Sequence, residues 1–155
     1  MNTRPIIDAV IARLQQHLPT RRIASCPENI LIGPDLLTAG DVLVGYRGSE
    51  FSAPEDADSP VQTQRPQLMV AVLLPALDGE DGVLTTLDIV RQALGGYRLP
   101  DCHRGIRLVR DRYVGYTEGR WHYAIDCTTE TLFIEDREQT DGPLLTTVNY
   151  EEKDA

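Results

Sequence analysis

Residues able to bind metals are poorly spaced for that purpose in this chain. Cys102 and His103 are adjacent, but a zinc site needs further Cys or His ligands at a recognisable spacing, and none follows. The acidic run Glu55, Asp56 and Asp58 lacks the twelve-residue spacing and the turn glycine of a calcium loop. We therefore interpret the first pair as a coincidental adjacency and the acidic run as part of a solvated loop.

Motifs for catalysis or cofactor binding are also missing from the sequence. It has no Ser/His/Asp or Cys/His arrangement suggested by a local motif, no nucleophile elbow and no glycine-rich phosphate loop. Carboxylates are plentiful, but none lies in a motif that would make it a general acid. Catalytic residues need not be neighbours in sequence, so this does not exclude an enzyme. The sequence nevertheless predicts a non-enzymatic protein with no catalytic residue, no cofactor and no metal.

Length and composition indicate one domain of an ordinary globular type. The chain has 155 residues, of which 41% are hydrophobic and 25% are charged. Three cysteines without a CxxC spacing, and an N-terminus without an apolar leader, indicate reduced thiols in a protein that matures in the cytoplasm. The net charge of -9 argues against a surface that grips nucleic acid phosphates. We expect no membrane partner, because no apolar run approaches the about 20 residues of a transmembrane helix.

The apolar run Leu68–Leu74 is the centre of the predicted fold. It contains no charge and lies between Pro66 and Pro75, which favours a strand covered on both faces. The cover could be helices, a partner sheet or another subunit. Two amphipathic segments, Thr3–Leu18 and Val83–Leu94, have apolar residues at helical spacing and suit one face of a sheet.

Further strands complete the predicted α+β fold. Short strands are expected at Arg21–Cys26, Asp41–Tyr46 and Leu132–Ile134. A β-hairpin is expected over Gly105–Cys127, with a bulge where the alternation slips at Arg110–Arg112. The predicted fold class is a mixed, mostly antiparallel sheet with two amphipathic helices packed on one face, plus this long hairpin.

We predict a single domain over residues 1–155 with a core at about 3–135, a mobile loop at 52–62 and an acidic C-terminal tail at 136–155. Loops of this length are often functional, so the loop could order against a neighbour. Arginines give the predicted hairpin a basic face, which is either simply solvated or an ion-pair surface for an acidic neighbour. The interface candidates are therefore Glu55, Asp56 and Asp58 in the loop, with Arg107, Arg110, Arg112 and Arg120 on the hairpin.

An amphipathic N-terminal helix is followed by DVLVGYRGSEFSAP, QRPQLMVAVLL, GVLTTLDIVRQALGGYRLP and RYVGYTEGRWHYAIDC. In this order, over roughly residues 3 to 135, the elements resemble the tail terminator family of Mu-like phages and prophages. The resemblance implies an α+β subunit of a hexameric ring that caps the tail tube, ends its polymerisation and presents the head-joining surface. It also implies assembly in the host cytoplasm, a place at the head-proximal end of the virion tail, and no catalytic or cofactor motif to transfer.

The implied partners are other copies of this chain, the tail tube protein, and beyond these the sheath of a contractile tail and the head-completion or connector protein. DNA would pass through the ring without specific binding, which suits the negative charge. Two other classes remain open. One is a head-completion or connector protein of the same virion, and the other is a small-molecule-binding domain or enzyme without a legible motif. A DNA-binding regulator is disfavoured by the charge.

Overall fold

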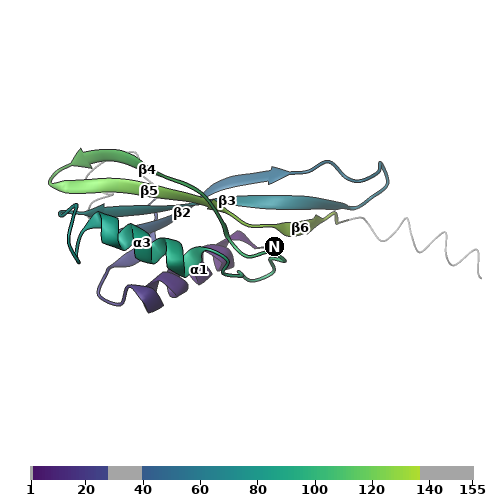
Figure 1. Ribbon diagram of the computed structural model, residues 1–155. Coiled ribbons are helices and arrows are strands. Elements are labelled where there is room, and N and C mark those ends of the chain that lie inside the picture. The colour runs from purple at the N-terminus through teal and green to yellow at the C-terminus, as the bar shows by residue number, and fades with distance from the viewer. Residues whose placement is uncertain (1, 28–39, 137–155) are drawn as a thin grey trace, which may run out of the picture.

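One long sheet with two helices on one of its faces forms the frame of the protein (Figure 1). The computed structural model describes residues 2–27 and 40–136. The strand order is β1-β2-β3-β5-β4, and β6 pairs with β3. β1 runs parallel to β2, whereas the other described pairings are antiparallel, which confirms the predicted fold class. The elements are α1 (Thr3–His17), β1 (Ile23–Ser25), β2 (Val42–Phe51), β3 (Val61–Leu74), α3 (Val83–Leu94), β4 (Arg107–Thr117), β5 (Arg120–Thr128) and β6 (Thr131–Ile134).

The inner half of β3 is buried on both faces, as its apolar run predicts. Every side chain of Leu68–Leu74 is 9% exposed or less. Side chains on one face join both helices in the main core, and those on the other face belong to a smaller cluster. Because successive side chains of a strand point to opposite faces, a continuous apolar run is what such a position requires. The smaller cluster consists of Leu43, Met69, Ala71, Leu73 and Ala124.

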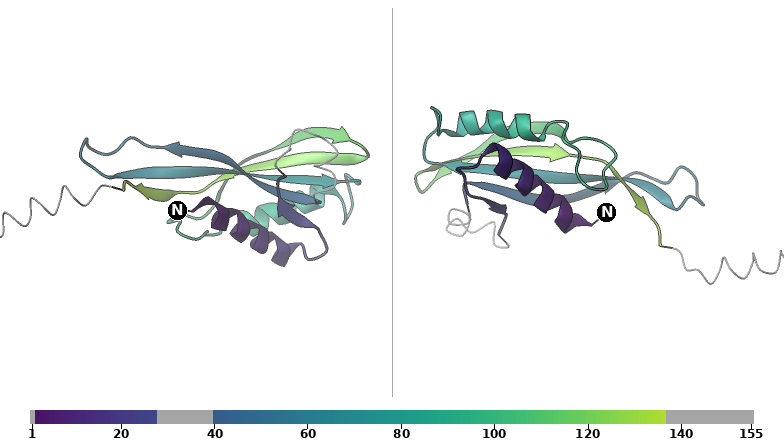
Figure 2. Two further views of the ribbon diagram at one scale, coloured as in Figure 1. Left: turned by 180° about the vertical axis from the view of Figure 1, so that it is seen from behind. Right: turned by 90° about the horizontal axis from the view of Figure 1, so that it is seen from below.

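The helices α1 and α3 pack side by side under the same part of the sheet (Figures 1 and 2). Each presents one apolar stripe to the sheet, including Val10 and Leu14 of α1 and Val90 and Leu94 of α3, all fully buried. Burying an aliphatic side chain of this size contributes about 1.5–3 kcal/mol. The two stripes therefore account for much of the stability of this half of the molecule.

The β4–β5 hairpin follows the prediction closely. Its turn residues Glu118 and Gly119 have φ of 49° and 81°, the left-handed pair that matches the twist of a two-residue hairpin. The register shifts twice, between Leu108 and Arg110 and between Tyr113 and Gly115. The predicted bulge at Arg110–Arg112 is thus two irregularities that flank this segment.

The loop predicted at 52–62 is shorter in the structure, because β3 begins at Val61. β6, found where the sequence predicts a strand at Leu132–Ile134, pairs with Val61 and the residues after it, and draws them into the sheet. The hairpin between β2 and β3 is closed by Ser52, whose N–H donates to the Thr63 carbonyl at 2.9 Å. Apart from Asp136, the predicted acidic tail lies outside the described residues.

Candidate assembly interface

The outer part of the sheet, where β3 pairs with β2 and β6, projects beyond both helices as an arm (Figures 1 and 2). We define the arm as residues 48–66 together with β6, and the body as the rest of the described chain. In the arm β3 pairs with β2 on one side and with β6 on the other. Neither α1 nor α3 covers it. β3 runs without interruption from the body into the arm, so the arm continues the backbone pairing of the sheet.

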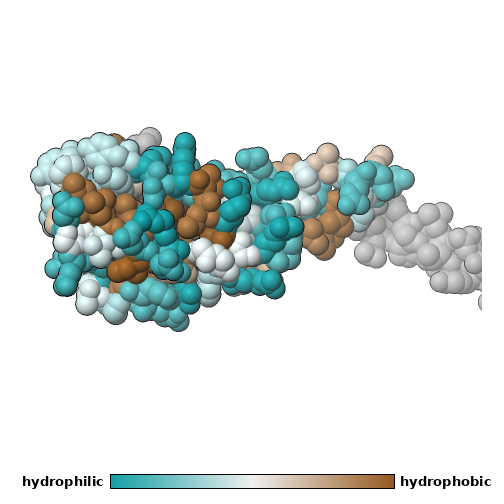
Figure 3. Space-filling view, viewed as in Figure 1, coloured by the Kyte–Doolittle hydropathy of each residue, from teal (hydrophilic) through white to brown (hydrophobic). Residues whose placement is uncertain are grey.

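Both faces of the arm expose large apolar side chains. Phe51 and Phe133 lie on the same side of the sheet as the helices. Their rings pack in a T-shaped, edge-to-face arrangement with centroids 5.9 Å apart. Leu132 and Ile134 alternate with Phe133 and therefore lie on the opposite face. These four side chains are 43% to 65% exposed, and apolar surface is visible on the narrow end of the molecule in Figure 3. Apolar groups clustered beside an open sheet edge favour contact with another chain.

The tip of the arm carries the predicted acidic candidates. Glu55, Asp56 and Asp58 are all exposed. The Asp56 carboxylate accepts the Asp58 backbone N–H at 2.9 Å, and the Asp56 carbonyl accepts the Ser59 N–H at 3.2 Å, so this segment forms a defined turn. The β4–β5 turn lies at the other end of the sheet (Figure 1). The loop candidates and the hairpin candidates are therefore not brought together within one chain.

Three of the four hairpin arginines form ion pairs within their own chain, on the sheet face away from the helices. The Nε atoms of Arg110 and Arg112 both lie 3.0 Å from Oδ2 of Asp126. Arg120 lies 3.6 Å from Asp41. These ion pairs neutralise part of the basic face within the chain. A contact between this face and a neighbouring subunit stays a prediction. Arg107 makes no ion pair within the described part of the chain.

The two carboxylates in these networks are absent from the candidates drawn from the sequence. Burial alone would raise the pKa of Asp126, but hydrogen bonds and charges from Arg112 and Arg110 outweigh it and hold the pKa below its usual value. Arg22 and Arg120 lower the pKa of Asp41 against burial in the same way. Asp126 stands directly opposite Arg110 in the hairpin register, so a predicted register would have identified this pair.

A hollow of ≈ 720 Å³ lies partly on the same helix-free face and is lined by Met69, Ala71, Arg112, His122 and Cys26 among others. Burial and the nearby charge of Arg112 lower the pKa of His122, which favours its neutral form. Burial raises the pKa of the Cys26 thiol, which disfavours the reactive thiolate. Neither group has the electrostatic surroundings of an activated nucleophile.

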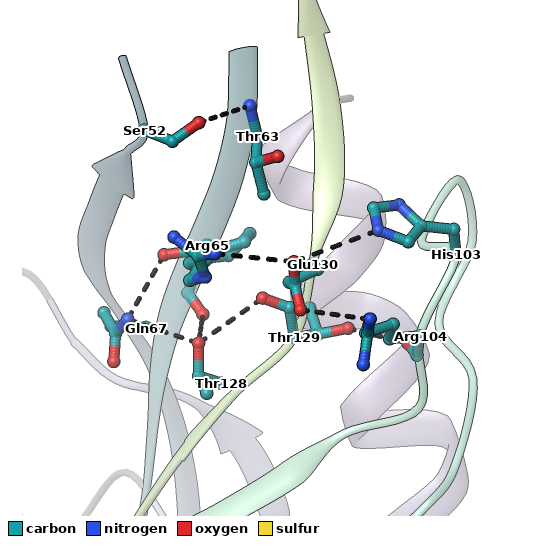
Figure 4. A network of polar contacts seen from close by, with 10 residues as sticks. Ser52, Thr63, Arg65, Gln67, His103, Arg104, Thr128, Thr129 and Glu130 are labelled. Carbon is teal, nitrogen blue, oxygen red and sulfur yellow. Dashed lines mark hydrogen bonds and ion pairs between the residues drawn. The ribbon is translucent and has the colours of Figure 1, made fainter. Parts of the chain in front are cut away.

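A basic cleft of ≈ 550 Å³ lies where the arm joins the body. Its one carboxylate, Glu130, is 3.2 Å from Arg104, 3.7 Å from Arg65 and 4.0 Å from His103 (Figure 4). Two further arginines, Arg98 and Arg107, line the same cleft, and neither has an ion-pair partner within residues 2–27 and 40–136. Three of its four arginines lie within residues 98–107, but Arg65 and Glu130 come from other segments of the chain, so no local sequence pattern predicts the cleft.

Buried threonines hold the loop that carries part of this cleft. Thr129 Oγ1 donates to the Arg104 carbonyl at 2.9 Å, and Thr131 Oγ1 donates to the Asp101 carbonyl at 2.6 Å. Both threonines are 2% exposed. A Cβ added to Gly105 would lie only 2.4 Å from the Gly96 carbonyl oxygen, so the chain segments around these two glycines are in close contact. The cleft is therefore a fixed feature of the fold.

The described residues contain neither a metal-ligand cluster nor a membrane-spanning helix. Among them, no group of three or more His, Cys, Asp and Glu side chains is placed to hold a metal ion. Cys102 is buried while the neighbouring His103 is exposed and faces Glu130, so these adjacent side chains do not converge on one site. None of the helices in this part of the chain has the length and apolar character needed to cross a bilayer.

The fold is shared with a virion protein. A chain in the solved virion of a native gene transfer agent particle matches with a TM-score of 0.53 and 13% sequence identity, over 84% of this chain and 96% of that chain. At this identity the match establishes the common fold. The Gp37 protein family model matches residues 10–152, and this chain belongs to that family. No curated protein matches the sequence.

Proposed function

We propose that this protein is a non-enzymatic structural component of a phage-like virion, and specifically a tail terminator. Copies of the chain form a ring, hexameric in the form that the sequence resemblance implies, which caps the tail tube at its head-proximal end. Membership of the Gp37 protein family supports this role, as does the fold shared with a chain of a gene transfer agent virion. The ring contacts the tail tube and, on its other side, the proteins of the head.

The arm is the observation that carries this proposal. Sheets with only three strands gain their stability from a buried face, and within this arm only Gln64, Pro66 and Thr131, all close to the body, are buried. Its exposed apolar side chains, such as Ile134 at 65%, are costly to leave in water and gain free energy when another chain covers them. A subunit that projects such an arm is suited to an assembly in which every copy meets a neighbour.

The overall charge supports a ring through which DNA passes. The net charge of -9 keeps the protein from retaining a duplex, since retention depends on Lys and Arg releasing counterions from the phosphates. A single subunit of this size has a radius of gyration of about 15 Å and cannot enclose DNA alone. A closed ring of copies meets both requirements.

The test is to add the purified protein to purified tail tubes and to image them by negative-stain electron microscopy. We expect a ring on one end of each tube, and tubes that no longer lengthen when tube protein is added. Binding to a portal complex without binding to tube ends would contradict the proposal and would identify a connector. A stable monomer that binds neither, but binds a small molecule, would point to a ligand-binding domain.

A matched pair of variants separates the arm from general surface effects. Ile134→Ser removes an exposed apolar side chain from the arm, and Leu84→Ser removes one from α3 in the body, where Leu84 is 41% exposed. We expect Ile134→Ser to reduce ring formation and tube capping, and Leu84→Ser to leave both unchanged. Equal effects of the two variants would contradict the role of the arm.

A further inference from the structure

The basic cleft stands out because the rest of the protein is acidic. Arg65, Arg98, Arg104 and Arg107 surround one carboxylate, that of Glu130, so the cleft has a formal charge of +3 from four positive groups and one negative group. The whole chain carries -9. Glu130 already interacts with three of the basic side chains around it, which leaves two guanidinium groups without a carboxylate in the described chain. Such a site attracts an anionic partner.

The tip of the arm has the opposite charge. Glu55, Asp56 and Asp58 give it -3 within four residues, and the described loop at 52–60 contains no basic residue. The tip and the cleft are separated by the length of the arm, because the cleft lies where the arm leaves the body (Figures 1 and 4). Since the arm is an extended sheet, the tip does not fold back into the cleft of its own chain.

We propose that the acidic tip of one copy docks into the basic cleft of the next copy. This inference rests on the proposed ring, and it names the contact that joins its subunits. Tip and cleft are different surfaces, so the contact is heterologous, and a series of such contacts closes into a ring when the rotation between copies permits. Each arm then crosses its neighbour, which also covers the apolar side chains of the arm.

The proposed contact pairs the acidic tip with arginines of the cleft, and not with the hairpin arginines that already have partners. Arg110, Arg112 and Arg120 have carboxylate partners in their own chain, and a neighbour that recruited them would have to compete with those ion pairs. Arg98 and Arg107 have no such competitor among the described residues. A carboxylate from a neighbouring tip can therefore pair with them without breaking an existing contact.

Nucleic acid is a less suitable occupant of the cleft than the tip. A phosphate backbone is a continuous row of charges and is bound by a patch or stripe of basic residues. Here the basic residues enclose a single hollow of ≈ 550 Å³ with a carboxylate inside it, which suits a compact turn with a few carboxylates. The test below includes DNA as a separate outcome.

Two complementary charge reversals test the contact. The tip variant Glu55→Lys/Asp58→Lys changes the tip from -3 to +1, and the cleft variant Arg98→Glu/Arg107→Glu changes the cleft from +3 to -1. Each variant alone then places like charges opposite each other, and we expect its self-association to weaken by roughly tenfold or more. In an equimolar mixture each tip meets a cleft of opposite sign, so assembly returns with alternating copies. Native mass spectrometry and analytical ultracentrifugation report the species.

Controls make each result decisive. Asp78→Lys/Glu80→Lys replaces two acids by lysine, as the tip variant does, but in the exposed turn before α3. It should leave assembly unchanged. Circular dichroism and thermal unfolding confirm that each variant is folded. If a double variant does not fold, the single changes Glu55→Lys, which leaves the tip at -1, and Arg107→Glu, which leaves the cleft at +1, are tested instead, and each should weaken self-association by a smaller factor. Recovery on mixing, in species with even copy numbers, is the result that supports the contact.

Several results would overturn the inference. Rings that persist in both variants would show that other surfaces join the subunits and would leave the tail-terminator proposal standing. Failure to recover on mixing, or an equal loss in the control, would show that the effect is not specific to this pair. A wild-type chain that stays monomeric at every concentration would overturn the contact, whereas capping of tubes by that chain would still support a tail terminator. Loss of binding to a DNA duplex in the cleft variant, with assembly unchanged, would assign the cleft to nucleic acid.

Discussion

β3 runs through two regions whose side chains have opposite surroundings. In the body, its residues 68–74 are buried on both faces, with helices on one side and a small apolar cluster on the other. In the arm, residues 61–66 include half-buried, buried and exposed positions, and no helix covers them. The backbone pairing is continuous across the boundary. The difference shows that one strand can supply the core of a folded subunit at one end and a surface for other chains at the other.

The contrast separates stability from assembly. Apolar contacts within the chain concentrate in the body, whereas the exposed apolar groups of the arm gain their cover only when another chain arrives. Changes in the body should therefore act on the free energy of unfolding, and changes in the arm should act on association.

The largest effect is expected for Leu94→Ala in the body. Leu94 is fully buried in the main core between α3 and the sheet. Truncation leaves a cavity and should lower the free energy of unfolding by about 2–5 kcal/mol. Urea unfolding followed by circular dichroism measures the change. A loss below about 1 kcal/mol would mean that the body is not the main source of stability.

A smaller effect is expected for Asp126→Asn, which removes the shared partner of Arg110 and Arg112. Hydrogen bonds to charged groups contribute about 1.5–3 kcal/mol, and the partial exposure of this pair reduces that, so we expect a loss of about 1–2 kcal/mol at pH 7. The pKa of Asp126 lies below its usual value of 3.8 in the folded state. Its contribution is therefore present at neutral pH and is lost as the pH falls through the folded pKa.

Thermal unfolding between pH 7 and pH 2 checks this prediction. The wild type should lose more stability than Asp126→Asn on acidification, and the two should approach each other at the acid end. Asp78→Asn, in an exposed turn, serves as the control and should keep the wild-type pH profile. A constant difference between wild type and Asp126→Asn at every pH would show that the effect is not electrostatic.

Gly119→Ala should cost about 1 kcal/mol, because a left-handed backbone conformation favours glycine. Its φ is 81° at the β4–β5 turn of the body, and no atom lies within 4 Å of the added Cβ. Gly48, in the arm, has a φ of 107° and is equally open. Gly48→Ala should lower the free energy of global unfolding less than Gly119→Ala does. The arm can open locally and relieve the backbone strain while the body stays folded. Denaturant unfolding of both variants sharpens the comparison.

The smallest effect on stability is expected for Ile134→Ser in the arm. Exposed positions away from the core usually change the free energy of unfolding by no more than about 0.5 kcal/mol. Hydrogen exchange should show unchanged protection in the body, while ring formation decreases. A loss of stability as large as that of Leu94→Ala would remove the distinction between the two regions.

Local patterns in the sequence were sufficient to predict most of the fold. The apolar run Leu68–Leu74, the two helical stripes and the Glu118–Gly119 turn each depend on residues close in sequence, so periodicity and turn chemistry identify them. The length of β3 was underestimated, because its first residues become a strand only by pairing with β6. An acidic loop over 52–62 is predicted from composition, but its place at the end of a projecting arm is not, and in the structure β3 begins at Val61.

Tertiary structure alone decided which charges are paired and which remain available. The basic face of the hairpin follows from strand alternation, but the ion pair of Arg112 with Asp126 depends on the register of β4 against β5. The ion pair of Arg120 with Asp41 forms across β3, which lies between β5 and β2. The basic cleft gathers Arg65 and Arg107 from strands far apart in the chain. Sequence patterns report the chemistry of neighbouring residues, whereas a cleft depends on distances set by packing. Packing also decides that the arm is exposed, since only the positions of α1 and α3 in the fold show which part of the sheet the helices leave uncovered.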